Sequence, residues 1–228
     1  MNVRSRIKKG MSLLIAITLL VAVHSTGASA APLIVSSYNM PNGDTGQYTY
    51  LDNTYVGTSP AINSSTAGAA LYGGTGKLTD GVVATLNWNV TPQYYVGWMD
   101  YNPTITFNFA KPVTINSVTF AFDDSMDSGG TDVTPPGSVV IGGNTYAVTV
   151  QTPLTTATYA PFLFTVGGLN LLGSSTAITI NRGQGNWFML SEVTFSGAVP
   201  ESPIFLTVLG GLLTMLFSRG SIHHRRKA

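Results

Sequence analysis

Apolar and polar residues alternate along short stretches in the middle of the chain. Residues 104–110 place an apolar side chain at every second position, and a period of two is typical of a β-strand with one buried face. A second alternating run follows over residues 113–122, but its register changes between Ile115 and Val118. A change of register within one run predicts a bulge or a bend, here near Asn116.

Similar short runs recur between turn-forming residues, and none of them carries apolar positions at helical spacing over three turns. Gly142 and Gly143 separate two of these runs and predict a β-hairpin. Residues 57–76 form the most loop-like stretch, and we expect an ordered loop there because Leu71 and Tyr72 can be buried. The predicted strands are 33–38, 94–98, 104–110, 113–122, 138–141, 145–150, 162–166, 177–180 and 187–195. Many short strands with frequent turns predict an all-β sandwich or jelly roll.

Charged residues are scarce and unevenly placed. They make up 9% of the chain, and residues 31–200 contain three cations against nine acids, a net charge of −6. An acidic domain is a poor partner for nucleic acid, because phosphate binding requires clustered Lys and Arg. The same residues contain no histidine, and the whole chain contains no cysteine. These absences exclude Ser–His–Asp triads from the middle of the chain, and disulfides and thiolate metal sites from all of it.

The first 30 residues have the three parts of a secretory signal peptide. Four cations precede an apolar run over residues 11–23, and Ala28 and Ala30 provide the small side chains at which signal peptidase cleaves. The apolar run would rise only about 20 Å as a helix, which is short of the roughly 30 Å hydrocarbon core. The pattern therefore predicts cleavage after Ala30 and export, rather than a retained anchor.

The last 30 residues combine a short motif, an apolar run and a basic tail. Val199-Pro200-Glu201-Ser202 precedes residues 203–218, which contain no charged residue and would rise about 24 Å as a helix. Four cations follow the run, and the positive-inside rule places such a tail in the cytoplasm. This pattern predicts a transmembrane helix that holds the preceding domain outside the inner membrane. The alternative is a plain C-terminal anchor.

The same three-part arrangement resembles the PEP-CTERM sorting signal of Gram-negative bacteria that make exopolysaccharide. The usual Pro-Glu-Pro is here Pro200-Glu201-Ser202, with a proline one place later at Pro203. The resemblance implies processing by an exosortase, a membrane transpeptidase-like protease. It also implies an inner-membrane intermediate, followed by a final location at the cell surface or in the extracellular matrix.

Four segments of the middle region resemble the discoidin-like, galactose-binding-like jelly roll related to coagulation factor 5/8 C-type modules. They are Lys77-Leu-Thr-Asp-Gly81, Pro103 to Pro112, Val113 to Phe120, and Trp187 to Phe195. In order and spacing they cover about residues 70–197. The resemblance implies a jelly-roll β-sandwich that often binds glycans with the loops at one end.

Five aromatic residues cluster within 14 positions: Trp88, Tyr94, Tyr95, Trp98 and Tyr101. Flat rings beside polar groups suit stacking against a sugar, so these residues are the candidate ligand-binding set. The alternative is that the rings pack in the core or at the rim of the sandwich, where Trp and Tyr are common.

Two acidic positions are candidate metal ligands. The discoidin-like resemblance implies one structural calcium held by Asp80 and Glu192. The alternative is that Asp80 only shapes its turn, while Glu192 pairs with Arg182 or Lys77. A second candidate is the acidic loop 123–132, which contains four carboxylates but fits no EF-hand spacing.

These observations predict four regions: a signal peptide (1–30), N-terminal strands and a loop (31–69), a discoidin-like sandwich (70–198) and a sorting signal (199–228). The predicted protein is a non-enzymatic surface or extracellular-matrix protein that binds exopolysaccharide or another glycan. One alternative is a purely structural biofilm-matrix protein with protein partners. A second alternative is an extracellular hydrolase, although no pair of carboxylates is singled out for glycoside hydrolysis.

Overall fold

The computed structural model describes residues 30–57, 64–123, 133–149 and 161–200. The chain divides into two units after Ala30, and the fold described is that of the second. The predicted signal peptide, the predicted transmembrane helix and the acidic loop beyond Asp123 lie outside the described residues. Within the described ranges, no helix has the length and hydropathy needed to cross a membrane.

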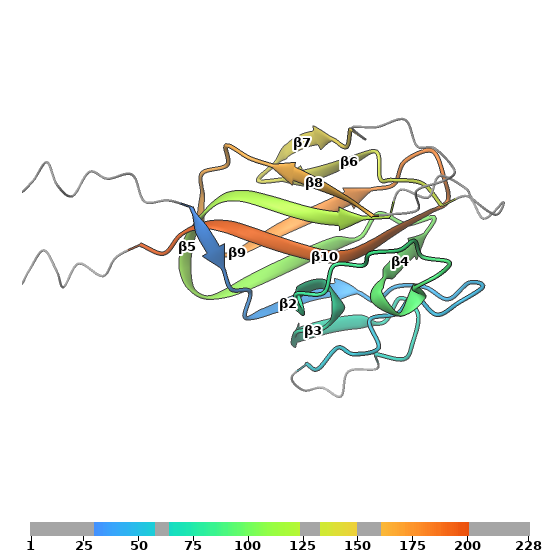
Figure 1. The fold of residues 1–228 in the computed structure, drawn as a ribbon. Helices are drawn as coiled ribbons and strands as arrows, with labels where there is room; N and C mark the ends of the chain where they lie inside the picture. Colours follow the sequence, from blue (N-terminus) through green and yellow to red (C-terminus); the bar gives the residue numbers. More distant parts are fainter. Residues whose placement is uncertain (1–29, 58–63, 124–132, 150–160, 201–228) are drawn as a thin grey trace, which may run out of the picture. The chain divides into compact units, whose positions relative to one another are not determined.

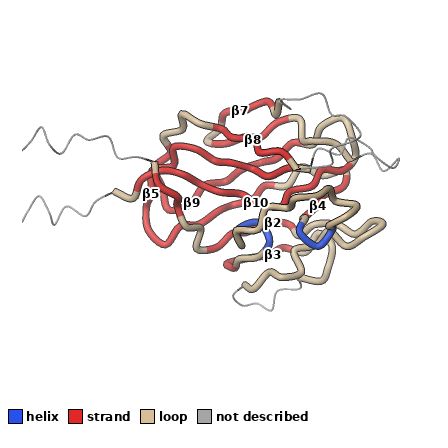
Figure 2. Tube along the Cα trace, viewed as in Figure 1, coloured by secondary structure: helices blue, strands red, loops and turns tan. Residues whose placement is uncertain are grey.

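The described part of the chain is all-β, as predicted, with two short 3-10 helices (Figures 1 and 2). Its strands are β1 Ala31–Leu33, β2 Ser37–Pro41, β3 Ala70–Gly74, β4 Val96–Met99, β5 Thr104–Phe122, β6 Ser138–Ile141, β7 Asn144–Ala147, β8 Phe162–Val166, β9 Leu171–Asn181 and β10 Trp187–Ala198. The 3-10 helices are η2 Lys77–Thr79 and η3 Pro92–Tyr94.

The long strand β5 belongs to two layers. Its first part pairs with β2 and β9, and its last part pairs with β8 and β10. The strand turns over near Lys111-Pro112, where its pairing with β9 is interrupted between Asn108 and Val113, and Figure 1 shows it curving from one layer into the other. One layer therefore has the order β3-β2-β5-β9-β6-β7, and the other contains β8, β5 and β10 with β1 and β4 along β10.

Aromatic side chains fill the space between the layers. Phe107 of the first layer contacts Phe195 of the second at 4.9 Å between ring centroids, and Phe109 contacts the same ring at 5.3 Å. Trp98 and Phe188 stack at 5.3 Å. These buried rings belong to one continuous hydrophobic core, and large aromatic side chains dominate the burial energy of such a core.

The predicted bulge near Asn116 is confirmed. Ser196 of β10 pairs with Ser117, but the next residue, Gly197, pairs with Ile115, so Asn116 has no partner on β10. An extra residue in one strand keeps the apolar side chains on both sides of it directed into the core.

The predicted strand 33–38 is wrong, because the chain forms two strands there. β1 pairs with β10 in one layer and β2 pairs with β5 and β3 in the other, so the residues between them cross from layer to layer. Ile34 lies in this crossing and is exposed. The local pattern of apolar residues does not reveal such a crossing, because it does not show which layer each flanking strand joins. In the expected loop 57–76, the last residues form β3; Leu71 is buried there, whereas Tyr72 is exposed.

The sandwich has two distinct ends. The loop end contains the connections 42–50, 100–103 and 182–186, which follow or precede β2, β4, β9 and β10. At the terminal end, β1 begins beside the end of β10, because Ala31 pairs with Gly197. β10 runs from the loop end to the terminal end, and 12 residues at about 3.3 Å each place the two ends roughly 35–40 Å apart.

Candidate functional site

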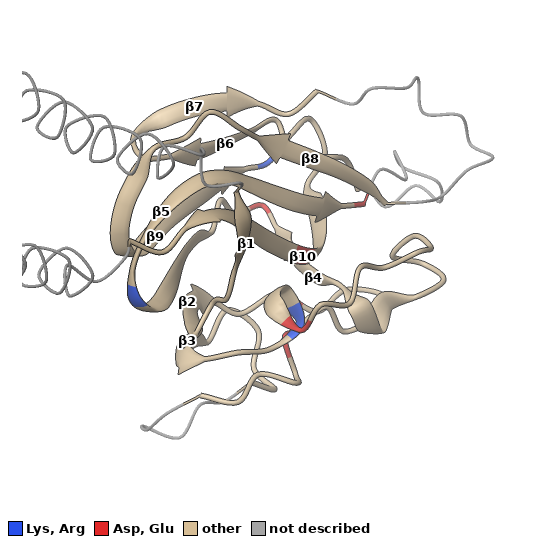
Figure 3. Cartoon of the chain, turned by 60° about the vertical axis from the view of Figure 1, so that its left-hand side comes forward, with Lys and Arg blue, Asp and Glu red and all other residues tan. Residues whose placement is uncertain are grey.

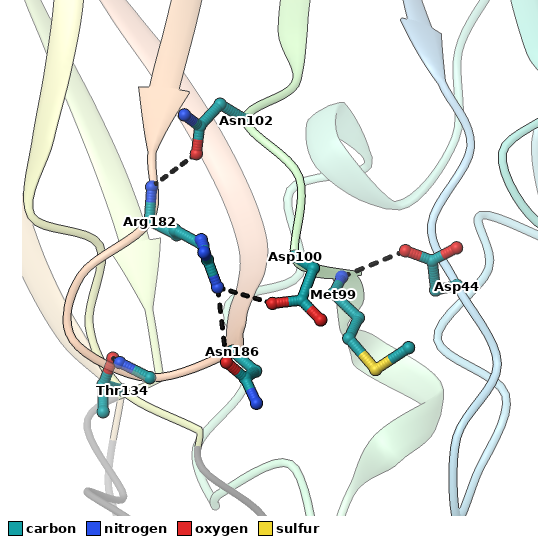
Figure 4. A network of polar contacts seen from close by, with 8 residues as sticks. Asp44, Met99, Asp100, Asn102, Thr134, Arg182 and Asn186 are labelled. Atoms are coloured by element: carbon teal, nitrogen blue, oxygen red, sulfur yellow. Dashed lines mark hydrogen bonds and ion pairs between the residues drawn. The ribbon is translucent and has the colours of Figure 1, made fainter.

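A network of polar side chains connects the turns of the loop end. Arg182 follows β9, Asp100 follows β4, and Asn186 precedes β10. The guanidinium of Arg182 lies 2.6 Å from Oδ1 of Asp100, and the same nitrogen donates to Oδ1 of Asn186 at 3.3 Å (Figure 4). Two turns that are 82 positions apart in sequence therefore present charged and amide groups together at the surface.

The backbone of this network is held in place at several points. Asp100 has a positive φ of 52°, a left-handed conformation that Asp adopts more readily than most residues. Its N–H donates to the carbonyl of Asn186 at 2.8 Å. The N–H of Arg182 donates to the side chain of Asn102 at 3.0 Å. Non-glycine residues in this conformation occur often at functional sites, and here the conformation brings the Asp100 carboxylate to Arg182.

Asp44 lies in the 42–50 loop and is hydrogen-bonded to two residues of β4. Its N–H donates to Gly97 at 2.8 Å, and its Oδ2 accepts the N–H of Met99 at 3.0 Å (Figure 4). Beside it lies an open cavity of about 370 Å³, within the size range of small-ligand pockets. The cavity is lined by Pro41, Asn42, Asp44, Gly68, Trp98, Met99 and Tyr101.

The structure divides the predicted aromatic set. Trp88, Tyr95 and Trp98 are at most 2% exposed, so these three rings have almost no free face for stacking against a sugar. The hypothesis that they bind a ligand by stacking is therefore corrected: they pack in the core. Tyr94 and Tyr101 are 40% and 50% exposed, and of these two only Tyr101 lines the cavity beside Asp44.

Trp88 belongs to a second cluster of buried residues near the loop end. Its ring makes an edge contact with Tyr50, which in turn makes an edge contact with Trp187. The three rings line a small hollow of about 170 Å³. Trp187 is the first residue of β10 and directly follows Asn186, so the packed rings adjoin the polar network.

The two predicted metal ligands do lie together. The N–H of Gly81, which follows Asp80, donates to Oε2 of Glu192 at 3.1 Å, and Oδ1 of Asp80 accepts the N–H of Val82 at 2.8 Å. Burial, together with the charge of Asp80, raises the pKa of Glu192 to about 8. Neither of the two cations considered as partners forms an ion pair with Glu192. Arg182 pairs with Asp100, and Nζ of Lys77 donates to the carbonyls of Leu51 and Tyr95.

Two neighbouring carboxyl groups supply the oxygen ligands that calcium prefers. Calcium takes six to eight oxygen ligands, so main-chain carbonyls or water would have to supply the others. Among the residues that the structure describes, no third Asp, Glu, His or Cys joins this pair.

Sequence reasoning missed Asp44, Asp100, Arg182 and Asn186 as site residues. Each lies in a turn of Asn, Asp and Gly residues between two strands, a composition that is common in ordinary turns. The only available signal was Arg182, the single arginine between residues 31 and 200. Its ion-pair partner Asp100 could be found only from the topology, because it lies 82 positions away.

No family model and no curated protein matches the chain, but several solved structures resemble it. The CBM32 of AlyQ, in complex with 4,5-unsaturated mannuronic acid, is 15% identical over 72% of this chain and 97% of its own, with a TM-score of 0.37. A fucolectin from striped bass serum (Morone saxatilis) is 15% identical over 75% and 80%, with a TM-score of 0.37. A chain of the Streptococcus pneumoniae beta-galactosidase BgaA is 10% identical over 73% and 98%, with a TM-score of 0.42. Because TM-scores below 0.5 do not establish a common fold, the function of this chain has to be inferred from its own residues.

Proposed function

We propose that this protein is an exported glycan-binding protein of the cell surface or extracellular matrix, and that it acts by binding rather than by catalysis. The observation that carries the proposal is the exposed network of Arg182, Asp100 and Asn186 at the same end as the cavity lined by Tyr101 and Asp44. Sugars present several hydroxyl groups that donate and accept at once, and carboxylate, guanidinium and amide groups meet both needs.

The charges of the site favour a neutral sugar over an acidic one. Arg182 is already paired with Asp100 at 2.6 Å, and Asp44 adds a second carboxylate at the cavity. Residues 31–200 also carry a net charge of −6. A uronate or sulfated glycan would meet net negative charge here, so the proposed ligand class is neutral exopolysaccharide.

Replacing Tyr101 with alanine should weaken glycan binding by up to about tenfold, because aromatic packing contributes about 0.5–1.5 kcal/mol beyond area burial. Arg182→Ala should weaken binding at least as much, since it removes a charged donor and releases Asp100. The measurement is titration calorimetry with a ligand first identified on an array of neutral and acidic oligosaccharides.

Tyr94→Ala is the matched control, because Tyr94 is similarly exposed but does not line the cavity. Its affinity should equal that of the wild type. Equal loss of glycan affinity in both tyrosine variants would show that the cavity is not the binding site. Absence of any saturable sugar binding would favour the alternative of a structural matrix protein that binds other proteins.

The proposed route to the surface is sorting by an exosortase. Val199 and Pro200 lie just beyond the end of β10 and Val199 is exposed, so the chain leaves the sandwich directly at the motif. This position supports access for a membrane protease, while Glu201 and Ser202 lie outside the described residues.

Changing Pro200 and Glu201 to alanine should leave an uncleaved precursor in the membrane of a host that has an exosortase. The reason is that the protease would lose the motif that marks its substrate, while residues 203–218 still hold the chain. The measurement is fractionation with an epitope tag placed after Lys227. Identical fractionation of the wild type and the double variant would contradict exosortase processing.

A single structural calcium at Asp80 and Glu192 is the proposed cofactor. The ion would replace the repulsion between two neighbouring carboxylates with attraction and would fix the η2 turn to β10. It would take no part in a reaction and would act only on stability.

A further inference from the structure

The terminal end of the sandwich is almost free of charge. It is built from the segments 31–36, 109–115, 167–173 and 195–200, which contain one charged residue, Lys111. The described acidic residues lie elsewhere: Asp44 and Asp100 belong to the loop end, where Asp123 also contacts Met189 of β10. Figure 3 shows how few charged residues the strands carry. The domain therefore has an apolar end and an acidic end.

Large apolar side chains are exposed at this end. Ile34 is 87% exposed and Leu172 is 71% exposed, and Val199 is also exposed. Leu172 pairs with Thr114, and Ala198 pairs with the same residue from the other side, so these strands meet there. A groove of about 340 Å³ opens at the same end beside β1 and the turn of β5, lined by Pro32, Leu33, Ile34, Ser36, Phe109, Ala110, Lys111, Val113 and Val199. Contiguous apolar surface of this kind marks an interaction site.

The length of chain beyond the sandwich identifies the partner. Residues 203–218 are apolar, and only Glu201 and Ser202 separate them from Pro200. A chain reaches at most about 3.3–3.6 Å per residue, so the distance from Pro200 to Pro203 is at most about 11 Å. This apolar segment is thus joined to the end that carries Ile34 and Leu172.

We propose that the terminal end is a membrane-contact surface, which rests on the lipid interface while residues 203–218 anchor the chain. Ile34, Leu172 and Val199 enter the headgroup region, and Lys111 meets lipid phosphates. The apolar face of an interfacial element is buried by about 5–10 Å, which the short connection to Pro203 allows. The loop end then points away from the membrane, at roughly 35–40 Å from it. This inference rests on the anchoring segment of the proposed function but not on glycan binding.

The absence of cysteine from the whole chain allows a direct test. Leu172→Cys and Leu163→Cys are each labelled with an environment-sensitive fluorophore in the full chain. Both leucines are exposed, at 71% and 62%, but Leu163 pairs with Ala121 toward the loop end. The chain is reconstituted into phosphatidylethanolamine–phosphatidylglycerol vesicles that carry headgroup spin-labelled lipids. We expect strong quenching of the label at position 172 and little at position 163.

A third label, at Ile34→Cys, should be quenched like that at position 172. Equal quenching at positions 163 and 172, or none at 34 and 172 in a vesicle-bound chain, would overturn the membrane-contact surface and leave the anchor intact. A full chain that does not float with the vesicles would overturn both the surface and the anchoring segment. Glycan binding in solution is independent of all three outcomes, so its failure is recognised separately.

Discussion

Replacing Asp52 with asparagine is expected to lower the free energy of unfolding by about 2–4 kcal/mol, although Asp52 lies outside the proposed binding cavity. Asp52 is fully buried. One oxygen accepts the hydroxyl of Tyr38, and the other accepts the N–H of Lys77 at 3.0 Å and the hydroxyl of Thr54 at 3.2 Å. Hydrogen bonds to a charged group contribute about 1.5–3 kcal/mol each, and an amide can replace only one of these oxygens as an acceptor.

The buried Lys77 increases the effect. Its ammonium group donates to two carbonyls, at 2.6 Å from Leu51 and 3.3 Å from Tyr95, and has no carboxylate within salt-bridge distance among the described residues. Burial lowers the pKa of Lys77 and raises that of Asp52, while each charge favours the charged form of the other. Removing the negative charge therefore leaves a buried cation with less compensation.

The matched control for this experiment is Asp100→Asn, which removes a carboxylate from an exposed ion pair with Arg182. Exposed ion pairs contribute about 0–1 kcal/mol, and Asn tolerates the positive φ of this position. Urea unfolding should separate the two variants clearly. Equal loss of stability in both would show that the buried network contributes no more than a surface pair.

Without calcium, the stability of the protein should fall as the pH rises from about 5 to 8, because Glu192 is buried beside Asp80. The folded-state pKa of Glu192 is about 8, raised by burial and by Asp80 from an ordinary value of 4.5. The folded state therefore holds a proton that the unfolded state releases, and the associated stability is lost as the pH passes through 8. Glu192→Gln should flatten the wild-type decrease in thermal unfolding temperature between pH 5 and 8.

Calcium should reverse this loss at pH 8 if the proposed ion is bound. A ligand that binds only the folded state adds about 2.7 kcal/mol at a hundredfold excess over Kd, a rise in Tm of very roughly 5–10 °C for a domain of this size. Glu192→Gln should abolish the rise, and Asp127→Asn in the acidic loop should not. Identical melting of the wild type in calcium and in chelator would exclude a calcium site at either place, and loss of the rise in Asp127→Asn alone would assign the ion to the loop.

Local pattern was sufficient for most of the sheet. The alternation in residues 104–122 and its change of register predicted the bulge at Asn116 and the two halves of β5, because each depends only on which neighbouring side chains are apolar. The two predicted strands, 104–110 and 113–122, are one continuous strand in the structure. The crossing at Ile34 was not predictable in this way. It depends on which layer each flanking strand joins, and that is decided by partners on β5 and β10 that lie 67 or more residues away.

The proposed binding cavity shows the same limit more strongly. The sequence does not distinguish an exposed tyrosine from a buried one. Tyr95 and Tyr101 were therefore equivalent candidates until the layers were known. Tyr95 directly precedes β4 and faces the interior, whereas Tyr101 lies beyond the end of that strand. Asp80 and Glu192 came together as predicted by the family resemblance, through a contact between residues 111 positions apart in sequence.

The course of β10 determines how the sandwich would bear mechanical load. β10 starts next to Asn186 at the loop end and finishes two residues before Pro200, where the anchoring segment is attached. Tension between a ligand held at one end and an anchor at the other would act along the axis of this strand. Its hydrogen bonds to β5 lie perpendicular to that axis, so they would be sheared together instead of being unzipped one by one. In a chain that keeps the proposed anchor and binds the proposed glycan, these bonds would therefore bear the load together.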